Sequence, residues 1–307
     1  MDEWCENKAV LIPTIVILAI IFVIGGAGNI CTCVVIIRTK TLHTRPNYFL
    51  LVLACSDMLL LFLGCPLEMY HLISCFTSSK LLCKFWFYVR EAYGSTSVMT
   101  ICAFTAERWL AVRHPLRMKL KLRTFCCALA AISNFALSVV TGFRMYVVSA
   151  EIEISENKTT EKCVGSVSKF IECTTIIIFI LSYLIPVVML ATMCFQIAAF
   201  ASPTTCTIQT ECSRKAPLKT NRLLVAVVIS FLICWSPHHI VQLITAFFIV
   251  ESEESVWEVI ISTSACCYYL NCAVNPILYN MFSEKFREAF LHMVNQGRVT
   301  ATAKIFW

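Results

Sequence analysis

Seven long apolar stretches constrain the fold of this 307-residue chain more than any other feature of its sequence. A helix of about 20 residues crosses a bilayer core of about 30 Å, and each stretch is at least that long. Apolar segments of this length, repeated along one chain, indicate an all-α membrane protein with a seven-transmembrane helix bundle. The stretches are approximately residues 9–37, 47–74, 83–113, 124–148, 170–200, 219–249 and 256–281.

The composition indicates that lipid is the main solvent of the protein surface. Hydrophobic residues make up 58% of the chain and charged residues only 14%, whereas a soluble domain carries about 25% charged residues. This excess of apolar side chains is too large for one buried core. Most of the 19 cysteines fall inside apolar stretches, where a free thiol behaves as a small hydrophobic group.

The distribution of basic residues predicts the orientation of the chain. If the amino terminus is outside, the inner segments hold most Lys and Arg residues and the outer segments most of the acidic ones, as the positive-inside rule requires. We therefore expect a multi-pass plasma-membrane protein with an extracellular amino terminus. The net charge of +6 then belongs to an inner face that suits anionic lipid and a protein partner, and it indicates no nucleic-acid partner.

The expected domain organisation follows from this orientation. Residues 1–8 form a short extracellular segment without the basic region of a cleaved signal peptide, so the first span is expected to act as its own anchor. Residues 9–281 form the bundle, residues 282–295 an amphipathic helix 8 on the inner leaflet, and residues 296–307 a short cytoplasmic tail. Asn157 opens an Asn-Lys-Thr glycosylation triplet in an outer loop.

Several polar side chains lie deep in the spans and are expected to form one buried network. An unpaired Asp57 at that depth costs about 2.5–3.5 kcal/mol. Prolines interrupt three of the helices and free carbonyl groups that a polar neighbour must satisfy. The network residues are Asp57, Asn29, Ser97, Asn271 and Asn275, and the prolines are Pro186, Pro237 and Pro276.

Five short motifs occur in order along the spans: GN in the first, LACSD in the second, ERW closing the third, CWSP in the sixth and NPILY in the seventh. With these motifs the sequence resembles the rhodopsin-like (class A) G-protein-coupled receptors over nearly its whole length. The resemblance implies a receptor rather than an enzyme, with a heterotrimeric G protein as its inner partner. It also implies no cofactor apart from an allosteric Na⁺.

The same resemblance implies roles for particular residues. The implied sodium pocket consists of Asp57, Ser97, Asn271 and Asn275. The implied activation switch consists of Pro186, Val98, Phe231, Trp235, Pro237 and Tyr279. The implied G-protein contact consists of Glu107, Arg108 and Trp109, with Trp109 replacing the usual tyrosine. Cys83 and Cys163 face the oxidising side, where a disulfide can form, and Cys5 with Cys75 is a second candidate pair there.

A narrower resemblance rests on GCPLEMYHL, Glu91, SPHH and NPILYNMFSEKFREAF. These segments are similar to neuromedin U receptors and their invertebrate pyrokinin-type relatives, with ghrelin and neurotensin receptors next. The resemblance implies a neuropeptide ligand, an arginine of an amidated peptide received by Glu68 and Glu91, and coupling to a Gq-type protein. Two carboxylates can clamp the planar fork of a guanidinium. The implied ligand-binding residues are Glu68, Glu91, Arg90, His238, His239, Gln242 and Tyr269.

Three alternatives stay open at this point. Arg90 could neutralise Glu68 or Glu172 inside the bundle, which would leave no charge for a ligand. Gln242 stands where the vertebrate receptors of the group carry an arginine, which alters the pocket and leaves the identity of the peptide open. Cys194 stands where a tyrosine is usual, as expected for divergent coupling or for an orphan receptor. A transporter or channel is the alternative from another class, but such proteins normally show internal repeats or polar rings, and the sequence shows neither.

Overall fold

The computed structural model describes residues 7–74, 79–113, 151–155, 158–162, 169–200, 211–247 and 254–305. The helices in these ranges are α1 (Lys8–Arg38), α2 (Arg45–Leu59), α3 (Cys65–Ile73), α4 (Lys80–Arg113), α6 (Lys169–Phe179), α7 (Ile185–Phe200), α8 (Glu211–Phe247), α9 (Glu254–Phe282) and α10 (Glu284–Ile305). Four of the spans that they form are long and apolar enough to cross a membrane. The all-α transmembrane fold is confirmed, and the fourth expected span, 124–148, lies outside the described residues.

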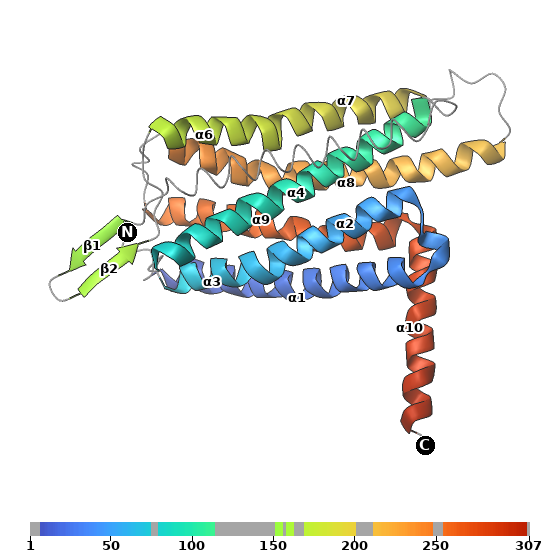
Figure 1. Ribbon diagram of the computed structural model, residues 1–307, viewed down its shortest axis with the longest axis horizontal. Helices are drawn as coiled ribbons and strands as arrows, with labels where there is room; N and C mark the ends of the chain where they lie inside the picture. Colours follow the sequence, from blue (N-terminus) through green and yellow to red (C-terminus); the bar gives the residue numbers. More distant parts are fainter. Residues whose placement is uncertain are drawn as a thin grey trace.

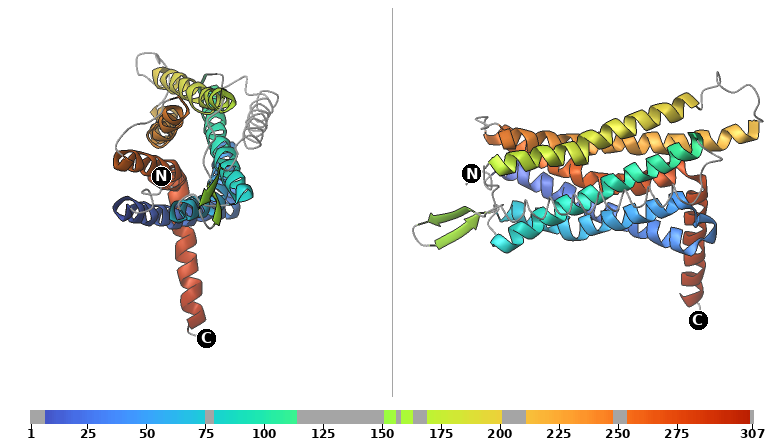
Figure 2. Two further views of the ribbon diagram at one scale, coloured as in Figure 1. Left: turned by 90° about the vertical axis from the view of Figure 1, so that its left-hand side faces the viewer. Right: turned by 45° about the horizontal axis from the view of Figure 1, so that its top comes forward.

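The long helices lie side by side in one bundle (Figure 1). The strands β1 (Glu151–Ser155) and β2 (Lys158–Lys162) project from the end where α1 begins, which we call the hairpin end. At the opposite end, which we call the α10 end, α10 leaves the bundle and turns sharply away from it (Figure 2). Helix α4 crosses the bundle at a slant and contacts both α2 and α7. Residues from one helix can therefore reach partners on both sides of the bundle.

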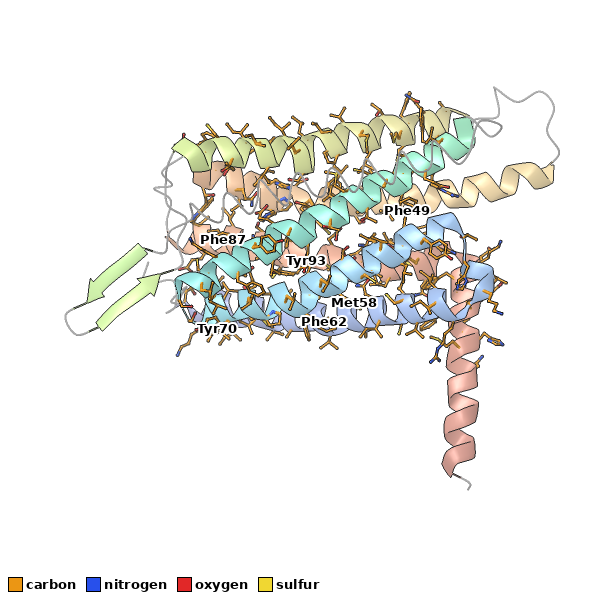
Figure 3. All side chains as sticks on the ribbon, viewed as in Figure 1. Phe49, Met58, Phe62, Tyr70, Phe87 and Tyr93 are labelled. Carbon is orange, nitrogen blue, oxygen red and sulfur yellow. The ribbon has the colours of Figure 1, made fainter. Side chains whose placement is uncertain are left out.

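The outer surface of the bundle differs from that of a soluble protein, because large apolar side chains cover it. Val23 of α1 is 65% exposed, Phe195 of α7 75% and Ile233 of α8 63%, and side chains stand outward along α1 and α7 (Figure 3). Apolar side chains also fill the interior, where Val98 and Phe231 are fully buried. Only a hydrocarbon solvent makes such an outer surface stable.

Two wide π-helical turns precede two prolines. The turn Leu60–Gly64 joins α2 to α3 just before Pro66, and the turn Ile180–Leu184 joins α6 to α7 just before Pro186. In each case the amide after the turn donates to the carbonyl five residues earlier. A proline ring clashes with the carbonyl four residues before it, so a wider turn there accommodates the ring while the helix continues.

A third proline lies inside α9 and leaves one carbonyl without its helical donor. Pro276 has no amide proton for the carbonyl of Cys272, four residues earlier. The Nδ2 atom of Asn29 donates to this carbonyl at 2.9 Å and to the carbonyl of Gly25 at 2.9 Å. Asn29 therefore joins α1 to α9 by satisfying the carbonyl that the proline frees, and its amide protons go to these two carbonyls rather than to Asp57.

Two elements differ from the sequence expectation. Residues 151–162, expected as an outer loop, contain an antiparallel hairpin in which Glu151 pairs with Lys162 and Ser155 with Lys158; the alternating Glu-Ile-Glu-Ile pattern is typical of a strand. Helix α10 begins at Glu284 and continues to Ile305, beyond the end that we expected at residue 295.

Candidate functional site

A buried ion pair near the hairpin end joins α3 to α4. The Nη1 atom of Arg90 lies 3.6 Å from the carboxylate of Glu68, and its Nη2 atom lies 2.9 Å from Nδ1 of His238 on α8. The guanidinium also lies over the rings of Trp86 and Tyr268, at 5.4 and 5.3 Å from the ring centres. We call these five residues the Arg90 cage. Internal pairing of Arg90 was left open by the sequence, and the structure pairs it with Glu68.

The carboxylate of Glu68 has donors besides Arg90. It is 4% exposed and accepts hydrogen bonds from Nε1 of Trp86 at 3.1 Å and from the hydroxyl of Tyr269 at 3.3 Å. Burying a carboxylate is costly unless several donors surround it. Trp86 and Arg90 stand four residues apart on α4, so both reach Glu68 from the same face of that helix.

The second carboxylate of the site has a neutral partner. Glu91 is partly exposed and accepts a hydrogen bond from Nε2 of Gln242 on α8 at 2.8 Å. Because an amide carries no net charge, this bond does not neutralise Glu91. Glu68, Glu91 and Arg90 together leave one net negative charge near the hairpin end of the bundle.

An aromatic column continues from the Arg90 cage into the interior. Tyr268 packs edge-on against Trp235 at 5.1 Å, and Trp235 packs against Phe231 at 5.8 Å. His239 stacks on Trp235 at 5.6 Å and lies 4.9 Å from the ring of Tyr183. Movement of the cage would therefore reach Trp235 through direct ring contacts.

The remaining residues of the implied activation switch lie along the same interior. Val98 and Phe231 belong to one buried apolar cluster with Trp235, and Pro186 is also buried. Pro237 is partly buried on α8. Tyr279 lies further toward the α10 end, fully buried, with its ring 6.2 Å from that of Phe286 on α10.

A second polar cluster surrounds Asp57 in the middle of the bundle. Asp57 is fully buried and accepts hydrogen bonds from Ser97 at 2.9 Å and from Nδ2 of Asn275 at 2.8 Å. The amide oxygens of Asn271 and Asn275 are buried and have no hydrogen-bond partner among the described residues. A carboxylate, a hydroxyl and two orphaned amide oxygens form the oxygen donor set that a hard cation prefers. Asp57, Ser97 and Asn275, which are joined by hydrogen bonds, therefore fit Na⁺, which would offset the charge of the carboxylate. The place of Asn271 in this pocket stays a prediction.

Polar contacts at the α10 end involve the ERW motif of α4. Arg108 donates from Nε to the carboxylate of Glu107 at 2.6 Å. Trp109 donates from Nε1 to Oε1 of Gln196 on α7 at 2.7 Å. The tryptophan that replaces the usual tyrosine is thus able to hold α4 against α7.

Some predicted features lie outside the described residues. Cys83 is 1% exposed and disulfide-bonded. Cys163 is outside the described ranges, so its pairing with Cys83 stays a prediction, as do the pairing of Cys5 with Cys75 and the glycosylation of Asn157.

Sequence reasoning missed four residues that shape these sites: Trp86, Tyr268, Gln196 and Gly94, the last of which lies against Tyr268 and Trp235. The spacing of four residues between Trp86 and Arg90 and between Arg90 and Gly94 was a usable signal, because such residues share one helix face. Tyr268 and Gln196 carried no comparable signal, because each meets α4 only through the packing of distant helices.

The bundle with its two buried polar clusters defines a class of membrane receptor. The model of the 7 transmembrane receptor (rhodopsin family) matches residues 28–279, so the chain belongs to that family of G-protein-coupled receptors. It is accordingly a multi-pass membrane receptor.

The relatives point to a narrower group. The chain is 31% identical to the neuromedin U receptor homolog nmur-2 of Caenorhabditis elegans over an alignment of 330 residues. The alignment covers 96% of this chain and 82% of the relative. It is 30% identical to neuromedin-U receptor 2 of Mus musculus over 298 residues, covering 92% and 75%. It is 26% identical to the pyrokinin-1 receptor of Drosophila melanogaster over 348 residues, covering 93% and 80%.

Proposed function

We propose that this chain is a receptor for a neuropeptide of the neuromedin U and pyrokinin type, and that the peptide is basic, arginine-containing and amidated. The observation that carries this proposal is that two carboxylates, Glu68 and Glu91, share one guanidinium, Arg90, so that these three groups together carry one net negative charge. The similarity to neuromedin U and pyrokinin receptors supports a peptide of that kind. We place the hairpin end and the amino terminus outside the cell, where a peptide arrives.

Glu91 is the proposed contact for the arginine of the peptide. Its carboxylate is partly exposed, and a guanidinium could replace the amide of Gln242 as its partner with a charge-assisted bond in place of a neutral one. Glu68 is the weaker candidate, because Arg90, Trp86 and Tyr269 already surround it. In this proposal Glu68 acts on the ligand through Arg90.

Signal transfer in this proposal is a shift between two populations of the bundle. A peptide that binds at Glu91 also displaces Gln242 on α8, the helix that carries Trp235. Movement of α8 would separate its inner end from α4 and release Arg108 from Glu107. A helix of a heterotrimeric G protein, which we propose to be of the Gq type, would then enter the groove at the α10 end.

Calcium mobilisation in cells expressing the full chain tests this function. A panel of arginine-containing amidated peptides should include an activator of the wild type. Losing a charge-assisted bond costs about 1.5–3 kcal/mol, so Glu91→Gln should lower the potency of that activator roughly 10- to 100-fold. Glu172→Gln, a glutamate of α6 outside the Arg90 cage, is the matched control and should leave potency unchanged.

Two outcomes would contradict the proposal. If the wild type reaches the cell surface and no peptide of the panel activates it, the ligand class is wrong. If a peptide activates the wild type and Glu91→Gln with equal potency, the receptor class stands but Glu91 is not the contact.

A further inference from the structure

The Arg90 cage has the parts of a ligand site for a guanidinium. A carboxylate lies 3.6 Å from Nη1, a histidine nitrogen 2.9 Å from Nη2, and two aromatic rings lie 5.4 and 5.3 Å from the central carbon. A planar cation between aromatic faces and opposite a carboxylate combines cation–π attraction with a charge-assisted contact. These parts come from four helices: α3, α4, α8 and α9.

The cage does not depend on Arg90 to hold its carboxylate. Besides Arg90, Nε1 of Trp86 and the hydroxyl of Tyr269 donate to Glu68 at 3.1 and 3.3 Å, and we expect both donors to remain when the guanidinium is removed. The hydroxyl of Tyr268 donates to the backbone carbonyl of Arg90, not to its side chain. Truncating the Arg90 side chain therefore removes the cation and leaves its surroundings in place.

Occupancy by Arg90 also limits what an external ligand can contact. The guanidinium takes up the charge of Glu68, whereas the neighbouring carboxylate Glu91 is hydrogen-bonded to the neutral amide of Gln242. An external cation would have to displace a side chain that is covalently part of the chain and therefore present at a very high effective concentration.

We propose that the Arg90 cage is a guanidinium-binding site that the receptor fills with its own side chain, and that this occupancy restricts an external ligand to one cationic contact, at Glu91. The first part stands on the geometry of the cage alone. The second part rests on the proposed function, because it assumes a basic peptide.

Chemical rescue with methylguanidinium tests the first part on the purified full chain. Arg90→Ala should unfold at a lower temperature than the wild type, and methylguanidinium should raise its Tm saturably, by roughly 2–4 °C. The wild type should show no rise beyond that given by sodium chloride at equal ionic strength. Methylammonium, which lacks the planar fork, should rescue Arg90→Ala less well than methylguanidinium.

One further variant and one further measurement keep this test decisive. The double variant Arg90→Ala/Glu68→Gln carries no carboxylate inside the cage and should fold without responding to methylguanidinium. If Arg90→Ala alone does not fold, methylguanidinium in the growth medium should restore it to the cell surface. The proposal would be overturned if the double variant folds but methylguanidinium does not restore Arg90→Ala to the cell surface. It would also be overturned if methylguanidinium raised the Tm of the wild type and of Arg90→Ala equally.

Citrulline scanning tests the second part. Citrulline is a neutral analogue of arginine, so a peptide with two arginines can lose one cation at a time. In binding to the wild type, one replacement should weaken affinity at least tenfold and the other should have no effect; in Arg90→Ala both should weaken it. Two sensitive arginines in the wild type would contradict the restriction to Glu91. The methylguanidinium result needs no peptide, so failure of the proposed function and failure of the cage are distinguishable.

Discussion

At the scale of single residues, Gly94 allows two aromatic side chains to meet in the bundle interior. A Cβ atom at this position would lie 2.9 Å from the ring of Trp235 and closer still to the hydroxyl of Tyr268. The hydroxyl of Tyr268 is the donor to the Arg90 carbonyl, so this close approach also positions the Arg90 cage. The absence of a side chain at Gly94 therefore leaves the space in which Tyr268 of the cage packs against Trp235 of the aromatic column.

Gly94→Ala should destabilise the receptor by about 1–3 kcal/mol, because neither ring can move without disturbing the packing around it. The measurement is thermal unfolding of the purified chain. The matched control is Gly26→Ala, where the nearest atom to the added Cβ is in Phe62 at 3.5 Å, an ordinary contact. Alanine also has the higher helix propensity, so the control should be neutral or slightly stabilising. Equal effects of the two substitutions would show that the space at Gly94 is not needed.

A second prediction at this scale concerns Asp57. Sodium chloride should raise the Tm of the wild type above its value in choline chloride, because a ligand that binds only the folded state stabilises it, by about 1.4 kcal/mol at tenfold excess over Kd. Asp57→Asn removes the charge that attracts the cation and should abolish the difference between the salts. Glu172→Gln is the control and should keep the difference. A wild type that is indifferent to sodium would refute the sodium pocket.

At the scale of elements, the two π-helical turns decide which side chains face the interior. An extra residue in one turn rotates everything after it by about 100° relative to a regular α-helix. Glu68 follows the turn Leu60–Gly64 and Pro66 on α3. The orientation of Glu68 toward Arg90 therefore depends on a local change of helix geometry that begins eight residues earlier.

Pro66→Ala should weaken the coupling between Glu68 and Arg90, because alanine lets the helix return to regular geometry and turn the carboxylate away. In the wild-type background Glu68→Gln should lower the unfolding temperature, whereas in the Pro66→Ala background it should have little effect. The difference between the two backgrounds is an interaction free energy on the order of 1 kcal/mol. Pro13→Ala, an exposed proline near the start of α1, is the control and should combine additively with Glu68→Gln. If the effects of Glu68→Gln and Pro66→Ala on the unfolding temperature are also additive, the π-helical turn does not orient Glu68 toward Arg90.

At the scale of the whole molecule, the apolar outer surface places the chain in a membrane, and the distribution of charge predicts its orientation there. Exposed side chains such as Val23 and Phe195 cover the bundle, and most basic residues fall on the side that we assign to the cytoplasm. The glycosylation triplet at Asn157 lies on the opposite side in this orientation.

Asn157→Gln tests that orientation in cells. The wild type should carry a glycan, so that endoglycosidase treatment shifts it to a faster-migrating band on a denaturing gel. Asn157→Gln should migrate at that position without treatment. Lys158→Gln retains the triplet and should migrate like the wild type. A wild type whose migration does not respond to endoglycosidase would remove this support for an extracellular amino terminus.

The sequence by itself determined the transmembrane class, the family and two partners of Asp57, Ser97 and Asn275. Asn29, which the sequence placed in the same network, bonds to backbone carbonyls instead. Span length and hydropathy follow from local composition, and Asp57 was recognisable because a carboxylate inside a span is too costly to lack partners. The need to satisfy a carbonyl freed by Pro276 was also predictable, because the missing amide is a local property of proline. The particular donor, Asn29, required the packing of α1 on α9.

Only the tertiary structure decided the partner of Arg90. The sequence left Glu68, Glu172 and an external ligand as alternatives, because α4 packs on several helices and sequence spacing does not fix their relative rotation. The π-helical turn before Pro66 sets the rotation of α3, and the slant of α4 brings Arg90 to Glu68 and to His238 of α8 at the same point. Charge complementarity requires no particular distance along the chain, so this choice depended on how the helices pack.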